Sequence, residues 1–330
     1  MCSAAALLAA LAGCIKRTER ITVHQDGRAD LSVEFNGDLD DFSGGDPMLA
    51  AEAPGWTVTE ERKTHDDGKI EMTRTAQRSV PPGTQIPDRY ALPSSENADV
   101  CLTFPTTVTI EKRGDGAYYH FRRVYTAREW ARYEYHQEHV FKDDLKELVE
   151  QDPDSLTPDQ QRQVILGFIE VEKMKAVEHA RAAGEELSAV VGQDARLAVE
   201  AAVRGVYDSI SADWAVDLMT APDKGERIAA EAERIVGEAK AAIRAALSRE
   251  GVPPSVVERF AAAHDRHMRR YAVAQDLGDE AWEVRVRLPG VIVGHNGDKL
   301  DGGEVVWAFE AAALTDRDLV LMATSRVAAP

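Results

Sequence analysis

The sequence predicts an α+β fold: an antiparallel β domain built from N- and C-terminal strands, with an inserted all-helical region. Apolar residues alternate with period two at both ends of the chain, whereas in the middle they recur at helical spacing. The 330 residues also exceed a single domain of roughly 100–200 residues. We therefore expect a β region over 14–125, a helical insertion over 126–279 and returning strands over 280–330.

The N-terminal strands follow from alternation interrupted by tight turns. Ile21 and Val23 precede the turn at Asp26 and Gly27, after which alternation resumes towards Phe35. A second hairpin is centred on the turn at 66–68, and a proline-rich loop follows it. Further strands are predicted at 100–104, 107–112 and 118–125. Because three of the turns end in Asp-Gly, antiparallel pairing is expected.

The middle of the chain has helical periodicity. Val164, Ile165, Phe168 and Ile169 form one apolar stripe, and a second runs from Ile228 to Leu247. Proline and glycine residues break the pattern into four or five helices, whose alanine-rich faces suit an elongated bundle.

Period two returns after Gly278. Alternating segments begin at Trp282, Val305 and Leu319 and are separated by turn residues. Three short strands cannot easily bury a core alone, so we expect them to complete the N-terminal sheet. The alternative is that they pack on the helices.

The first 14 residues have the features of a secretory leader. Residues 2–13 are uncharged and end in small residues before Cys14. Leu11, Ala12, Gly13 and Cys14 resemble the lipobox of bacterial lipoproteins, which implies a signal peptide over 1–13 and a lipidated Cys14. No Lys or Arg precedes Cys14, unlike the usual leader, which leaves open a start codon upstream. The alternative is an apolar N-terminal helix packed on the domain.

Lipidation of Cys14 predicts where the protein is located in the cell. Acyl chains such as palmitate would contribute about 0.8 kcal/mol per buried methylene, enough for stable anchoring when two or more are present. No other segment approaches 18 consecutive apolar residues, so we expect the rest of the chain outside the cytoplasm, on the periplasmic or extracellular face of the envelope. In lipoproteins, Ile15 in place of Asp after the cysteine favours the outer membrane. The order of lipobox, hairpins, helices and terminal strands, including PGVIVGHNGDKLDGGEVVWAF, resembles lipoproteins of the LppM type.

Charge and cysteine content exclude some classes of function. The formal net charge of −18 disfavours a nucleic-acid partner, because an acidic surface repels phosphate backbones. Of the three cysteines, Cys2 and Cys14 belong to the leader and the lipid site, which leaves Cys101 alone and predicts no disulfide framework.

Two histidine pairs form the one candidate metal site. His136 and His139, like His264 and His267, are three residues apart and would lie on one helix face, so two such helices could supply four nitrogen ligands. The alternative is that all four are packed helix residues with satisfied nitrogens, since apolar residues surround both pairs. The spacing also lacks the glutamate base of the zinc protease motif.

Aromatic residues gather where the last N-terminal strand meets the first helix. Tyr118, Tyr125, Trp130, Tyr133 and Tyr135 are candidates for a binding surface, because exposed tyrosine and tryptophan mark interfaces. Alternatively, they fill the junction between sheet and helices.

Together these features predict a lipid-anchored extracytoplasmic binding or interaction module, not an enzyme. We expect membrane attachment through the N-terminus and an envelope protein partner, with the small-molecule ligand, if any, left open. No cofactor motif or nucleophile elbow occurs in the sequence. Two alternatives remain: a metal-dependent envelope enzyme using the paired histidines, and a self-associating scaffold.

Overall fold

The computed structural model describes residues 15–39, 42, 49–50, 52–66, 68–92, 94–152, 155–220 and 224–329. The lipobox and Cys14 lie outside them. The described chain divides into two compact units, which we call the helical unit (130–271) and the β unit (15–129 and 272–329). The predicted boundaries were 125/126 and 279/280. N- and C-terminal strands share both sheets and all seven described helices lie between them, so the predicted α+β fold with a helical insertion is confirmed.

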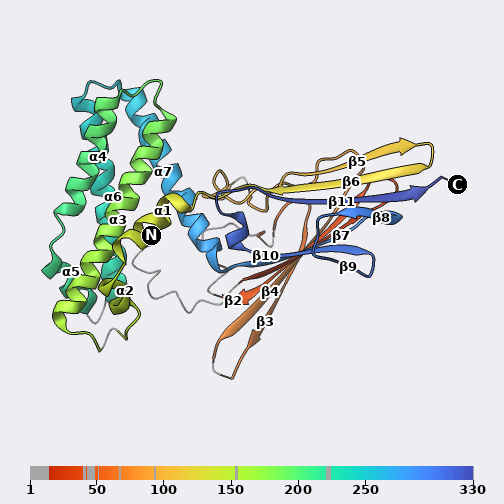
Figure 1. The fold of residues 1–330 in the computed structure, drawn as a ribbon, viewed down its shortest axis with the longest axis horizontal. Helices are drawn as coiled ribbons and strands as arrows, with labels where there is room; N and C mark the ends of the chain where they lie inside the picture. The colour runs from red at the N-terminus through yellow and green to blue at the C-terminus, as the bar shows by residue number, and fades with distance from the viewer. Residues whose placement is uncertain are drawn as a thin grey trace. The chain divides into compact units, whose positions relative to one another are not determined.

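The β unit contains two sheets, which we call sheet A and sheet B (Figure 1). Sheet A has the spatial order β3 (Thr57–Thr64), β4 (Ile70–Val80), β2 (Ala29–Asp38), β1 (Lys16–Val23), β7 (Ala281–Arg287), β10 (Glu304–Glu310) and β9 (Lys299–Asp301). Sheet B has the order β5 (Thr106–Arg113), β6 (Gly116–Tyr125), β11 (Leu319–Ala328) and β8 (Val291–His295).

One hydrophobic core joins the two sheets. It combines inward residues of sheet A, such as Val33 and Val286, with Phe121 and Leu321 of sheet B. The rings of Phe121 and Trp307 lie 6.3 Å apart across the two layers. Because successive side chains of a strand point to opposite faces, the period-two pattern places one set in this core.

The two halves of the chain meet in a parallel pair. β1 and β7 run side by side with Lys16 opposite Ala281 and Thr22 opposite Arg287. All other strand pairs are antiparallel, as the Asp-Gly turns predict. A parallel pair needs a long crossover, which here contains sheet B strands and the whole helical insertion.

One predicted strand is wrong. Residues 100–104 form a turn and an extended segment outside both sheets. Val100, Leu102 and Phe104 are nevertheless buried in the core, and Arg128 Nη1 donates to the Val100 carbonyl at 2.6 Å. The alternation therefore reports burial of a covering loop, whose backbone bonds to the Arg128 side chain, the Asp88 carbonyl and the Thr126 amide and does not join a sheet as a strand.

The segment from β8 to β9 closes one side of the sandwich by passing from sheet B to sheet A. Asn296 holds the crossing: its Oδ1 accepts from Trp307 Nε1 at 3.0 Å and from the Met322 amide at 2.8 Å, and its Nδ2 donates to the Val320 carbonyl. A Cβ at Gly297 would lie 2.5 Å from Val305 Cγ1, so only glycine fits. The GHNGD sequence thus has a structural explanation.

The helical unit is a bundle of four long helices with three short ones (Figure 1). The helices are α1 (Ala131–Val140), α2 (Asp144–Val149), α3 (Pro158–Glu186), α4 (Gln193–Asp208), α5 (Ala212–Thr220), α6 (Lys224–Arg249) and α7 (Pro254–Asp276), the last of which continues into the β unit. A second core of Val177, Val199, Ile243 and Phe260 joins α3, α4, α6 and α7.

Local signals explain the helix ends. Thr157 and Gln160 form a capping box before α3, with Pro158 in its first turn. Gly251, with φ of +72°, ends α6. The predicted number of four or five helices is too low, because the short α1, α2 and α5 lack a long apolar stripe. Among the described residues, no helix has a stretch long and apolar enough to cross a membrane.

Candidate functional site

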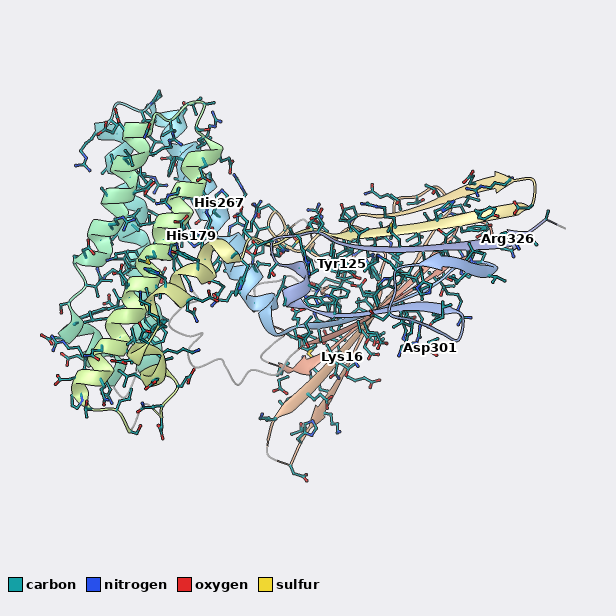
Figure 2. The ribbon with its side chains drawn as sticks, in the orientation of Figure 1. Lys16, Tyr125, His179, His267, Asp301 and Arg326 are labelled. Carbon is teal, nitrogen blue, oxygen red and sulfur yellow. The ribbon has the colours of Figure 1, made fainter. Side chains whose placement is uncertain are left out.

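The helical unit buries a group of polar side chains that we call the His–Tyr cluster. It comprises Tyr133 and His136 of α1, Lys175, Glu178 and His179 of α3, and His264, His267 and Tyr271 of α7. Figure 2 labels His179 and His267 on their helices. The i, i+3 and i, i+4 spacings on α3 and α7 place these residues on one face of each helix. Clusters of buried ionisable groups mark candidate functional sites.

Aromatic rings form the centre of the cluster. The Tyr133 ring centroid lies 4.4 Å from that of Tyr271 and 4.8 Å from that of His179. The His179 and His264 rings meet edge to face at 6.4 Å. The Tyr133 hydroxyl and His179 Nδ1 form a hydrogen bond of 3.2 Å, so His179 is held by α1 as well as by its own helix.

Charged side chains surround these rings. Glu178, which is buried, accepts from Arg132 Nε at 3.0 Å and is paired with Arg181. The buried Lys175 Nζ lies 5.1 Å from the Tyr271 ring centroid, and the same atom is 3.4 Å from Glu172. The charges at the edge of the cluster are therefore paired, whereas its centre is uncharged.

The two central histidines are neutral at pH 7. Burial, with a contribution from the Lys240 ammonium, lowers the pKa of His264 to about 4. Burial and the neighbouring His264 and His267 lower the pKa of His179 well below its usual value. His264 is 2% exposed, and within the described residues neither of its ring nitrogens has a hydrogen-bond partner. Protonating either ring would place a new charge in an apolar setting.

The predicted metal ligands do not converge. His264 and His267 are buried on α7, and His267 Nε2 lies 3.2 Å from Glu186. His136 Nε2 is 3.5 Å from Glu178, whereas His139 is exposed and stacks on Tyr135. In the part of the chain that the structure describes, no three His, Cys, Asp or Glu side chains are placed to hold a metal ion.

The predicted aromatic surface is divided between interior and exterior positions. Tyr125 is fully buried in the β unit and Tyr133 in the helical unit, so neither is available to a partner. Trp130 is partly covered because it stacks on Tyr271 at 5.6 Å. Tyr135 is 60% exposed, and Tyr118 is partly exposed on β6.

The β unit has its own buried polar group, the Glu19–Arg123 cluster. Glu19 is paired with Arg123 and accepts from the Tyr125 hydroxyl at 3.1 Å, while Arg123 Nε donates to Thr106 at 2.8 Å. Burial alone would lower the pKa of Arg123, but the Glu19 charge raises it above its usual value. A cavity of only about 10 Å³ adjoins this cluster, about the size needed for one water molecule.

Strand parity is the signal that could have found this second cluster. Glu19 shares its face of β1 with Ile21 and Val23, and Arg123 lies between Phe121 and Tyr125 on the inward face of β6. A charged residue at an inward position of a strand needs a buried partner of opposite charge. Neither Glu19 nor Arg123 was among the site residues predicted from the sequence.

Comparison with known proteins does not assign this chain to a family. No protein-family model and no curated protein matches the chain. Among solved structures, the NMR structure of the folded domain of LppM from Mycobacterium tuberculosis is similar at 9% sequence identity and a TM-score of 0.28, covering 97% of this chain and 93% of that chain. A similarity at this level defines neither a shared fold nor a shared function.

Proposed function

We propose that this chain is a lipid-anchored interaction module of the bacterial envelope, held on the extracytoplasmic side through Cys14. The lipobox sequence Leu11-Ala12-Gly13-Cys14 is the motif on which the proposal rests. The single structural observation that supports it is the position of the next residue. Ile15 is 3% exposed in the core of the β unit, and its carbonyl accepts from the Ala281 amide at 3.0 Å.

This position leaves no spacer between the lipid and the folded domain. β1 begins at Lys16, two residues after Cys14. Acyl chains on Cys14 would therefore hold the N-terminal ends of β1 and β7 at the level of the lipid headgroups. The opposite ends of these strands, with the turn at Gly27, would point away from the bilayer and present the β unit to partners.

The test is intact mass spectrometry of the protein recovered from membranes of its native host. The mature wild-type chain should begin at Cys14 and carry acyl mass, and Cys14→Ala should remain unprocessed and lose that mass. Cys101→Ala is the matched control, because Cys101 is a buried cysteine distant from the lipobox in the sequence and its loss should leave acylation intact. An unmodified wild-type chain that retains residues 1–13 would refute the proposal.

A further inference from the structure

The two sheets have four edge strands, and three of them carry charges. β3 contains Glu60, Glu61, Arg62 and Lys63, β5 ends in Glu111, Lys112 and Arg113, and β9 contains Lys299 and Asp301. Charged residues on an edge strand oppose pairing with another chain. β8, the fourth edge, belongs to a stretch from Leu288 to Gly297 with no Asp, Glu, Lys or Arg, in a chain of net charge −18.

β8 is also the edge strand with the most exposed apolar side chains. Val291 is 71% exposed and Val293 is 53% exposed on β8, while Ile292 between them packs on the core. The register with β11 places Arg326 opposite Val291 and Thr324 opposite Gly294, so the exposed apolar surface of this edge consists of the two valines. Exposed backbone groups beside exposed valines form a site at which a further strand can add to the sheet.

The sequence of β8 identifies the strand that fits. Gly290-Val291-Ile292-Val293-Gly294 reads the same in both directions. An antiparallel pair centred on Ile292 places Val291 of one copy opposite Val293 of the other at both positions. A two-fold interface requires this kind of self-complementarity, because one patch must fit itself. We infer that two copies of this chain pair through β8 and join their four-stranded sheets into one of eight strands.

Two features keep the pair weak. β8 has only five residues, and its register against β11 shifts between Thr324 and Ser325, where Val293 is the extra residue of a β-bulge. A contact of this size belongs among transient interfaces, with a dissociation constant above about 10 μM. The inference does not depend on lipidation, although anchoring both copies in one membrane would raise their effective concentration.

Sedimentation analysis of residues 15–330 over a concentration series tests the inference, since both hydrophobic cores lie within this range. We expect a reversible dimer. Val293→Lys places an ammonium group opposite Val291 of the other copy in both pairs, and the two like charges lie diagonally across the interface, which should weaken dimerisation at least tenfold. Thr59→Lys, at an exposed position of the edge strand β3, is the matched control and should leave the dimer intact.

Disulfide trapping tests the register. In a Cys101→Ala background, mixing Val291→Cys with Val293→Cys should give a covalent dimer, because opposite residues lie within the 4.4–6.8 Å Cα separation that a disulfide allows. Either variant alone should crosslink far less. Circular dichroism of each variant checks folding. A chain that stays monomeric up to about 1 mM, or a dimer that Val293→Lys leaves unchanged, would overturn the inference, and the former would leave a different protein's strand as the occupant.

Discussion

The β unit and the helical unit each bury a polar cluster, and the two clusters differ in how fully their polar atoms are bonded. In the Glu19–Arg123 cluster, carboxylate, guanidinium, phenol and threonine hydroxyl bond one another within the core. In the His–Tyr cluster, both ring nitrogens of His264 lack a partner among the described residues. The first cluster keeps its charges because they are paired, and the second remains buried because its central rings are neutral.

This difference indicates which kind of change destabilises each unit most. A paired buried charge is stable until one partner is removed, since the other is then left uncompensated. A neutral buried histidine is stable until protons are supplied, because the unfolded chain binds them more readily. Mutation should therefore act most strongly on the first cluster, and acid on the second.

The largest effect is expected from breaking the charge pair in the β unit. Arg123→Met leaves Glu19 buried and should lower the free energy of unfolding by about 3–5 kcal/mol. Chemical denaturation followed by tryptophan fluorescence measures the loss. The double variant Glu19→Gln with Arg123→Met should recover part of that stability. If the double variant lost as much as the two single variants together, the side chains would not be coupled.

Acid should destabilise the helical unit more than the β unit. The pKa of His264 is lowered from 6.5 to about 4, so its contribution to stability is present above pH 6.5 and is lost as the pH falls towards 4. Between pH 7 and 4.5 we expect His264 to account for a loss of about 2–3 kcal/mol. His179, His267, Asp265 and Lys240 face the same region, and the lowered pKa of His179 adds to the total pH dependence.

Urea unfolding at both pH values measures this loss. His264→Gln should flatten the pH dependence, whereas the exposed control His139→Gln should not alter it. Identical pH dependence in wild type and His264→Gln would show that this ring does not cause the acid sensitivity.

The smallest expected effects come from removing one hydroxyl in each cluster. Tyr125→Phe removes a phenol that bonds the charged Glu19 and Arg123, so it should cost about 1.5–3 kcal/mol. Tyr133→Phe removes a bond to the neutral His179 and should cost about 0.5–1.5 kcal/mol. Thermal unfolding of both variants shows which substitution costs more stability. A larger loss in Tyr133→Phe would contradict the contrast between charged and neutral partners.

Periodicity was sufficient for the fold class and insufficient for some of its parts. Alternation from Ile21 to Phe35 and from Trp282 to Val286 predicts strands because each has one buried face. The same alternation at Val100, Leu102 and Phe104 marks a buried loop, since alternation records burial and does not record whether a neighbouring strand exists. The parallel β1–β7 pair could not be read locally, because it joins residues more than 250 positions apart.

The candidate site was only partly predictable. The His264–His267 spacing drew attention to α7, but His179 of α3 was not among the candidates because it has no neighbouring histidine in the sequence. Which rings meet depends on how three helices pack. Burial of Tyr125 and Tyr133 likewise depends on tertiary contacts that aromatic clustering in the sequence does not reveal.

The parallel pairing of β1 with β7 has a consequence for biosynthesis. β1 leaves the ribosome among the first strands, but its neighbour on one side is Ala281–Arg287, which emerges only after the entire helical unit. The helical unit is contiguous and can fold before β7 is in place. Until then the β7 side of β1 is an open edge in an apolar hairpin, the kind of surface that chaperones protect. Slow, late closure of the sandwich is therefore expected to limit the folding rate of the whole chain.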